Sequence, residues 1–386
     1  MKQRPRGASC SPFWIVLALA SFGSARADIL TVDDDGPADF AVVADAVAAA
    51  QPGDVIVVEL GNYTGDLLAI DKPITIAGRN GGPRPAFGFG IEMQADVPFA
   101  MARIRASSFT ATDITSRLRL QGCSFSSLTF NGAGQAMVNG GEVKFGIDAV
   151  KIYNGAVVSM AGVEIVGGSF DDLGTYGVLV SNGLSGLVPN VTLAGCDVEG
   201  GSAGGGFIDG NGGDAIFAVT GPTGTSVRGS SFHTIRGGTG LGGFDGTSIV
   251  GNVDYSGVAT VPAPPILSPV DPPQPYLTNT SSRLGEVAEV DVFGPAGQPA
   301  LLLGSLGTVE PVAVPGWDGG RLWVNPAALV LIAGITLDGQ DDAATSSFTI
   351  PDDETLIGLT VDLQAIAVMP GGAWHLTNPG QFIVRP

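Results

Sequence analysis

A short motif recurs through the middle of the chain: an apolar residue, any residue and a glycine, followed by more apolar positions. Its copies are at residues 120–125, 160–165, 193–198, 227–232 and 249–254. Two further landmarks recur: residues 148–150, 176–178 and 214–216 lead into short apolar runs, and double glycines occur at 167–168, 200–201 and 237–238. Short strands joined by glycine turns, with variable insertions, are typical of a solenoid whose coils stack on one another. Glycine supplies the left-handed backbone angles that tight corners require.

The competing folds are a β-sandwich and a β-propeller, but the repeats are irregular and carry no blade signature, which favours the solenoid. Aligning the motif predicts one column of stacked side chains, formed by Cys123, Val163, Cys196, Ser230 and Asn252. The two cysteines would lie about two coils, or roughly 9–10 Å, apart. We therefore expect no disulfide, because its Cα atoms must come within ~7 Å.

The regions that flank the repeats differ from them. Phe40, Val43, Val47 and Ala50 recur at helical spacing, Asp39 is placed to cap this helix, and residues 51–53 end it. A buried strand is expected at 54–58, and residues 72–78 are expected to begin another strand. Residues 261–275 are rich in proline, which is typical of a semi-rigid linker. Beyond them, alternating apolar runs divided by Pro and Gly turns predict an antiparallel β-sandwich of about seven strands.

The first residues have the pattern of an export signal. Lys2, Arg4 and Arg6 precede an apolar run at 13–20, and residues 25–27 have the small-x-small pattern that signal peptidase cleaves. The run is shorter than the ~20 residues that span a bilayer. We expect bacterial-type export to a secreted or cell-surface location, a mature chain that begins at Asp28, and no membrane span after cleavage.

Charge and cysteine content limit the function classes. The formal net charge is −19, and removing the four basic residues of the leader would make it about −23. With no basic stripe, such a chain is a poor partner for nucleic acid. Polyanionic substrates are also disfavoured unless Ca²⁺ bridges the charges. Two cysteines remain after cleavage, too few for a disulfide scaffold.

Residues 30–78 resemble the N-terminal part of pectin lyase-like right-handed β-helix proteins. The resemblance is carried by the segments 30–33, 39–40, 46–50, 52–56, 61–63 and 72–78. In that family the helix caps the N-terminal end of the solenoid and shields its core. This N-terminal part is specific for fold and weak for function, because enzymes and non-enzymes share it. The C-terminal region resembles the β-sandwich tails of secreted proteins from bacteria such as planctomycetes, on segments 356–359, 364–365 and 376–379.

The predicted fold class is all-β: a right-handed parallel β-helix with an N-terminal capping helix, followed by a small antiparallel β-sandwich. The expected organisation is a signal peptide at 1–27, the β-helix at 28–260, a Pro-rich linker at 261–275 and the C-terminal β-sandwich at 276–386.

Enzymes of the pectin lyase-like superfamily suggest three activities to test. The motifs of pectin methylesterases are not reproduced at residues 134–137 or 206–210. Polygalacturonase-like glycosidases need companion motifs for the pair Asp171-Asp172, and none occurs, so this pair is interpreted as a solvated turn. The remaining enzymatic option is a Ca²⁺-assisted uronate lyase, with Lys151 or Arg236 as the base and Asp148 and Asp214 as calcium ligands. In the alternative interpretation the two aspartates bond local backbone amides and Lys151 is solvated, because Tyr176 fills the matching place in the coil between.

The leading hypothesis is a secreted, non-catalytic β-helix surface protein with a structural or adhesive role, and with carbohydrate as a candidate ligand. Its expected partners are extracellular polysaccharides or components of the cell envelope, with no cofactor besides the Ca²⁺ of the lyase alternative. Carbohydrate contact requires aromatic faces beside polar groups. The aromatic residues available are Tyr153, Tyr176, Phe207, Phe217, Phe232 and Phe244.

Overall fold

The computed structural model describes residues 27–79, 82–170, 173–183, 186–203, 211–218, 224–230, 232–241, 244–250, 253–256, 258–261, 274–279, 283–306, 312–314, 321–339, 341 and 343–386. Residues 1–26 of the expected leader, most of the expected linker (262–273), Asp171-Asp172, Phe207 and Asn252 lie outside these residues.

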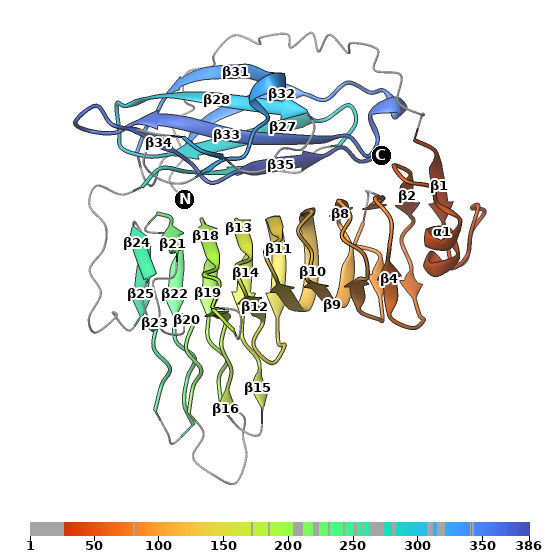
Figure 1. Ribbon diagram of the computed structural model, residues 1–386, viewed down its shortest axis with the longest axis horizontal. Helices are drawn as coiled ribbons and strands as arrows, with labels where there is room; N and C mark the ends of the chain where they lie inside the picture. Colours follow the sequence, from red (N-terminus) through yellow and green to blue (C-terminus); the bar gives the residue numbers. More distant parts are fainter. Residues whose placement is uncertain are drawn as a thin grey trace, which may run out of the picture.

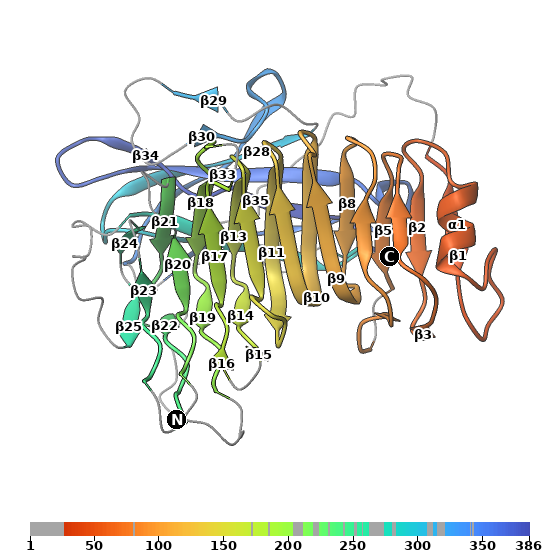
Figure 2. The same ribbon diagram turned by 60° about the horizontal axis from the view of Figure 1, so that its bottom comes forward.

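Residues 29–261 form a parallel β-helix whose 23 paired strands run side by side (Figures 1 and 2). Each coil contributes to three faces. The first face contains β1 (Ile29–Val32), β2 (Val55–Val58), β5 (Thr75–Gly78), β8 (Phe99–Ala102), the starts of β10 (Arg117–Asn131) and β11 (Gln135–Lys144), β13 (Val157–Ala161), β18 (Asn190–Ala194), β21 (Gly224–Arg228) and β24 (Val253–Ser256).

The other two faces follow in each coil. The second contains β3 (Asn62–Tyr63), β6 (Ala86–Phe87), the start of β9 (Arg105–Thr112), the middle of β10, the end of β11, β14 (Glu164–Val166), β19 (Asp197–Glu199), β22 (Thr234–Arg236) and β25 (Ala259–Val261). The third contains β4 (Leu68–Ile70), β7 (Ile91–Met93), the ends of β9 and β10, β12 (Val150–Tyr153), β17 (Val178–Ser181), β20 (Ile216–Ala218) and β23 (Ile249–Val250).

Columns of apolar side chains fill the interior, because alternate residues of a strand point to opposite sides. One inward column of the first face runs through Ile56, Ile76, Met101, Leu120, Val138, Met160, Leu193, Val227 and Tyr255, all of them buried. Each member contacts apolar atoms above and below it, so stacking removes both from water. The only α-helix among the described residues, α1 (Val43–Ala49), buries Val43, Ala46 and Val47 at the N-terminal end of this core.

Helix α1 begins later than its apolar spacing predicts. Its N-cap residue is Val42, which makes no side-chain capping bond. Asp39 does not cap the helix; its carboxylate accepts hydrogen bonds from the backbone N and the hydroxyl of Thr31, each at 2.8 Å. The segment between Asp39 and the helix is held by strand β1 rather than by the helix, since Phe40 forms a bridge with Val32.

Three of the five motif glycines have the left-handed backbone predicted for tight corners, at the corner after the first face; Gly229 does not, and Gly251 lies outside the described residues. Gly122, Gly162 and Gly195 have φ between 57° and 62°, in the left-handed region. The pairings bring Cys123, Val163 and Cys196 into one column, and both cysteines are free. However, the cysteines lie three coils apart rather than two, because residues 135–144 form a coil that the motif alignment did not count.

The fifth motif copy was aligned wrongly. Ile249 pairs with Ile216 on the third face, and it is Val253 that pairs with Thr225 on the first face. Residues 249–254 therefore straddle a corner that the other four copies do not occupy. An apolar-x-Gly triplet is too short to distinguish one glycine corner of the coil from the next.

The three double glycines each begin an arm that projects from the corner between the second and third faces (Figure 1). Strands β15 (Ser169–Phe170) and β16 (Leu173–Gly174) lie in the first arm. One chain of backbone hydrogen bonds crosses all three arms: Thr175 N donates to Gly168 O, Gly201 N to Thr175 O, Gly213 N to Gly201 O, and Gly238 N to Gly213 O. A Cβ on Gly201 would overlap the carbonyl oxygen of Gly168. Only glycine allows backbones to approach this closely.

The C-terminal region is an antiparallel β-sandwich. One sheet contains β26 (Tyr276–Asn279), β27 (Val287–Phe293) and β32 (Ala344–Thr349), and the other contains β28 (Pro299–Leu306), β31 (Leu329–Thr336), β33 (Thr360–Val368), β34 (Trp374–Leu376) and β35 (Gly380–Ile383). Strands β29 (Val312–Ala313) and β30 (Arg321–Leu322) form a separate pair, and two 3-10 turns span Pro326–Ala328 and Glu354–Leu356. Val290, Val292, Leu302 and Leu363 pack between the sheets. The predicted fold class is confirmed.

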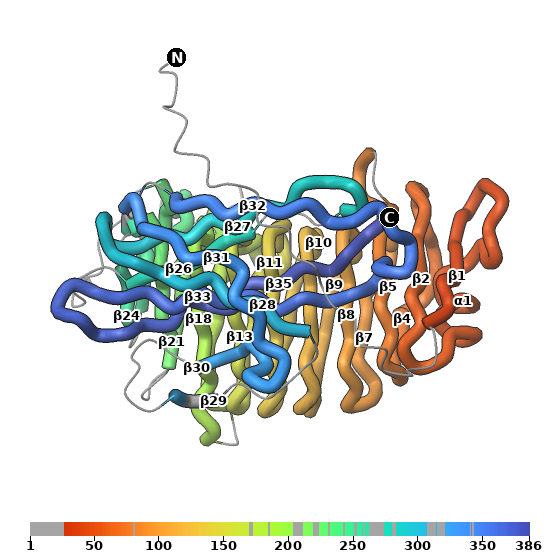
Figure 3. Tube along the Cα trace, turned by 90° about the horizontal axis from the view of Figure 1, so that it is seen from above, coloured from red at the N-terminus to blue at the C-terminus, as the bar shows by residue number. Residues whose placement is uncertain are grey.

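The sandwich lies along the first face of the β-helix and covers several coils (Figures 1 and 3). Ile383 packs on Ala100 and Ala102, and Tyr276 packs on Ala161 and Ala194. The last two residues of the expected linker also contact other parts of the molecule: Pro275 O accepts a hydrogen bond from Arg228, and Gln274 N donates to the Ser256 hydroxyl. The two units therefore share a packed interface.

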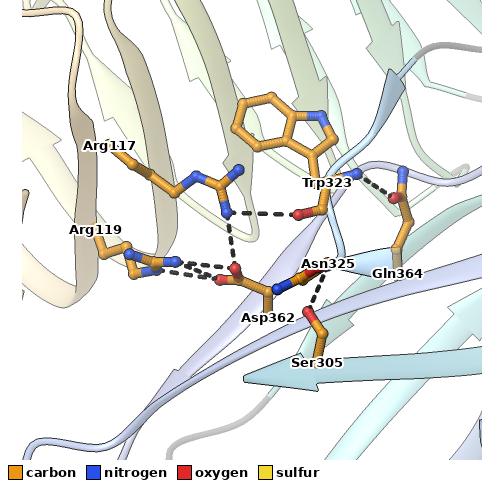
Figure 4. A network of polar contacts seen from close by, with 7 residues as sticks. All are labelled: Arg117, Arg119, Ser305, Trp323, Asn325, Asp362 and Gln364. Carbon is orange, nitrogen blue, oxygen red and sulfur yellow. Dashed lines mark hydrogen bonds and ion pairs between the residues drawn. The ribbon is translucent and has the colours of Figure 1, made fainter. Parts of the chain in front are cut away.

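A buried ion-pair network fastens this interface (Figure 4). Arg117 Nη1 lies 2.7 Å from Asp362 Oδ2, and Arg119 donates to both oxygens of the same carboxylate at 2.9–3.1 Å. The three side chains are 1–4% exposed. Arg117 also lies over the ring of Trp323, 5.5 Å from its centroid. The first face is thus occupied by the protein's own C-terminal domain, and the second and third faces remain as candidate surfaces for ligands.

Candidate functional site

Three of the residues proposed from the sequence share one corner of the β-helix. Val150 pairs with Val178 and Val178 with Ile216, which places Asp148, Tyr176 and Asp214 at the start of the third face in successive coils. This confirms the alignment of the second landmark. Lys151 follows on β12, and its Nζ lies 3.7 Å from Asp148 Oδ2.

Both aspartates bond the backbone of the next coil. Asp148 Oδ1 accepts from Tyr176 N at 3.2 Å, and Asp214 Oδ1 accepts from Thr247 N at 2.8 Å. Each carboxylate therefore links one coil to its neighbour. The sequence suggested bonds to local amides, whereas the partners lie 28 and 33 residues further along the chain.

The corner does not have the donor set of a calcium site. Asp148 and Asp214 are two coils apart, roughly 10 Å, and the Tyr176 ring lies in the coil between. Burial and the charges of Asp214 and Asp148 raise the pKa of Tyr176. Calcium requires six to eight oxygen ligands. Among the described residues the one group of three or more closely spaced metal-ligating side chains is the mostly exposed run Asp33 to Asp35, far from this corner along the chain.

Arg236 is not near Lys151. It lies on β22 of the second face, in register with Glu199, and its side chain is exposed. Lys144, Val166, Glu199 and Arg236 form one column, so Arg236 is three coils beyond the coil that contains Lys151. The structure therefore separates the two bases proposed for the lyase.

Aromatic side chains accompany the polar residues on the third face. The rings of Tyr176 and Phe217 are stacked, with centroids 4.7 Å apart and planes 19° from parallel. Both are partly exposed, as are Tyr153 and Lys151. Phe232 and Phe244 are 71% and 82% exposed; Phe232 lies in the turn before β22, and Phe244 lies in the third glycine arm, where its backbone N donates to Asn211 Oδ1. We call the group of Asp148, Lys151, Tyr176, Asp214 and Phe217 the aromatic corner.

A serine–histidine pair occurs at the corner after β21. Ser230 Oγ lies 2.9 Å from His233 Nδ1. Ser230 is 1% exposed, and its oxygen also accepts from Phe232 N, while burial lowers the pKa of His233. A nucleophile must be reached by its substrate. This pair therefore closes a tight turn.

No helix among the described residues is long and apolar enough to cross a membrane. Comparison of the chain with protein-family models and with curated proteins finds no match.

Proposed function

We propose that this chain is an exported, non-catalytic β-helix protein of the cell surface that binds polysaccharide through the aromatic corner on its third face. The stacked, partly exposed rings of Tyr176 and Phe217 beside two carboxylates and an ammonium group carry this proposal. A sugar ring presents an apolar C–H face and a rim of hydroxyl groups. It is therefore complementary to an aromatic ring that has charged hydrogen-bonding groups beside it.

The solenoid favours binding of a chain over binding of a single small molecule. Successive coils repeat the same outward positions at about 4.8 Å, and the glycine arms stand beside this face. The first face is unavailable because the sandwich covers it. Extended concave or flat surfaces of this kind are how solenoid proteins engage long partners.

We do not propose the lyase. Lys151 lies beside Asp148, Arg236 is three coils away on another face, and Asp148 and Asp214 bond backbone amides. An elimination needs a base and a charge-neutralising group at one substrate unit. The same purified protein tests this alternative, since a lyase would produce unsaturated uronates that absorb ultraviolet light.

The binding test is affinity electrophoresis in gels that contain neutral soluble polysaccharides, together with sedimentation on insoluble cell-envelope polysaccharide. Tyr176→Ala and Phe217→Ala should each weaken retention about tenfold, since an aromatic contact contributes on the order of 1 kcal/mol beyond its area. Phe232→Ala, which removes an exposed ring elsewhere, is the matched control. Retention that neither corner variant weakens, or no retention on any polysaccharide, would refute the proposal.

A further inference from the structure

An open groove of about 800 Å³ lies over the N-terminal part of the second face. Its charged lining consists of Arg84, Arg103, Arg105 and Glu142, and the remainder is formed by residues of the turns at 60–62 and 82–86 and by Gly122. Cavities of several hundred Å³ accommodate ligands of several rings. Three guanidinium groups around one groove are unexpected in a chain with a net charge of −19.

The acidic residue of the groove is already occupied. Glu142 accepts from Arg84 at 3.1 Å and from the Ser124 hydroxyl at 3.0 Å, and Lys144 Nζ lies 3.1 Å from its other oxygen. The hydrogen bond from Lys144 is the largest cause of the lowered pKa of Glu142. Arg103 and Arg105 have no acidic partner within 4 Å in the described parts of the chain.

Arg105 and Glu142 belong to the same outward column, with Ser124 between them. Glu164 and Asp197 continue this column toward the C-terminal coils. The column is therefore basic at its N-terminal end and acidic beyond Ser124. Asp34 also lies near the groove, because its carboxylate accepts a hydrogen bond from the backbone N of the lining residue Asn62. Arg103 and Arg105 are therefore the charged lining residues that no described acidic side chain pairs with.

Arg103 occupies a backbone position where the following coils have glycine. Its φ is 56°, and Gly122, Gly140, Gly162 and Gly195 at the same corner have φ between 57° and 63°. Residues with a Cβ rarely adopt this conformation. Strain of this kind that persists against a clear local preference is commonly associated with function.

The surroundings of Arg103 also favour an anion. Nη2 donates to Gly82 O at 2.6 Å, which fixes the guanidinium over the groove, and Nε is buried with no hydrogen-bond partner among the described residues. Burial and the neighbouring charges of Arg84 and Arg283 lower the pKa of Arg103. Clustered guanidiniums repel one another, and an oxyanion between them would relieve that repulsion.

We propose that the groove binds an acidic saccharide chain, with Arg103 and Arg105 holding its carboxylate or sulfate groups. A planar guanidinium matches the two oxygens of such a group. The groove is much larger than one inorganic ion, which favours a chain over free sulfate or phosphate. This site is distinct from the aromatic corner, which lies on the third face, and does not depend on it.

The decisive variant is Arg103→Gly. Glycine is the residue of the repeat at this corner, so the variant should unfold at the same urea concentration as the wild type or a higher one. It should nevertheless lose binding of a short oligogalacturonate or of a sulfated oligosaccharide by roughly tenfold or more, measured by titration calorimetry. Arg105→Gln, on an exposed strand position, should weaken binding similarly, whereas Arg321→Ala removes a positive charge from the sandwich and should not.

The probes separate the possible outcomes. Binding of an acidic oligomer that requires Arg103 and Arg105 supports the proposal, and the preferred oligomer identifies the charged group. The proposal is overturned if neither acidic oligomer binds, if a neutral oligosaccharide binds as tightly, or if inorganic sulfate alone matches the oligomers. Binding that both arginine variants leave unchanged would also overturn it. This outcome is independent of whether Tyr176→Ala and Phe217→Ala, the variants of the aromatic corner, lose binding to neutral polysaccharide.

Discussion

The carboxylate of Asp362 provides the sharpest test of how the two units are joined. Asp362 is 1% exposed and accepts four hydrogen bonds at 2.7–3.1 Å from Arg117 and Arg119, whose side chains are 3% and 4% exposed. Asp362→Asn keeps the volume but removes the charge. Two buried guanidiniums then lack a counter-ion, and removing one partner of a buried pair costs about 3–5 kcal/mol.

The assay is urea unfolding followed by tryptophan fluorescence, since Trp323 lies against Arg117 at this interface. Glu286→Gln is the control, because it breaks an exposed Arg283–Glu286 pair in the same domain and should cost less than about 1 kcal/mol. Replacing Asp362, Arg117 and Arg119 together by apolar residues of similar size should recover most of the loss. If Asp362→Asn shifts the unfolding free energy no more than Glu286→Gln does, the carboxylate is not buried between the sandwich and the first face of the β-helix, and the proposed docking of the two units is wrong.

Three further predictions concern other parts of the chain. Burial raises the pKa of Cys123 to about 11 and of Cys196 to about 12, so neither thiol should react with a thiol reagent at pH 8 until urea is added. Fast labelling of the native protein would contradict the placement of the two cysteines in the core. Gly201→Ala should destabilise the glycine arms by about 1–3 kcal/mol or more. Gly65→Ala, whose Cβ would meet only ordinary contacts, should be tolerated. Equal urea unfolding midpoints for the two variants would contradict the close packing of the arms. Mass spectrometry of the exported protein should give a mature chain that begins at Asp28, and a product that retains residues 1–27 would refute the leader.

The inward columns could be predicted from the sequence because they depend on local chemistry. Alternating apolar residues and glycine corners are enough to place Leu120, Met160 and Leu193 in one column. The same reasoning failed where a short pattern fits two corners, as at residues 249–254, and where a coil has a weaker copy of the motif, as at 135–144.

The outward surface could not be predicted in the same way. The sequence placed Asp148 and Asp214 at matching corners, but only the register identified the amides of Tyr176 and Thr247 as their partners. The arginines of the groove come from two segments, the turn at Arg84 and the corner that leads from Arg103 into Arg105, and no sequence spacing connects Arg84 with Glu142.

What the sequence determined by itself is the class of fold: the period of the apolar residues and the glycine corners specify stacked coils and a separate sandwich, because both depend on backbone angles and burial within a few residues. What only the tertiary structure decided is which outward side chains meet water. Arg117, Arg119 and Gln121 alternate with Leu118 and Leu120, a pattern that predicts a solvated strand surface, and yet they are buried under a domain more than two hundred residues away. Burial of an outward residue depends on what docks against it, and that contact is not encoded in the neighbouring residues.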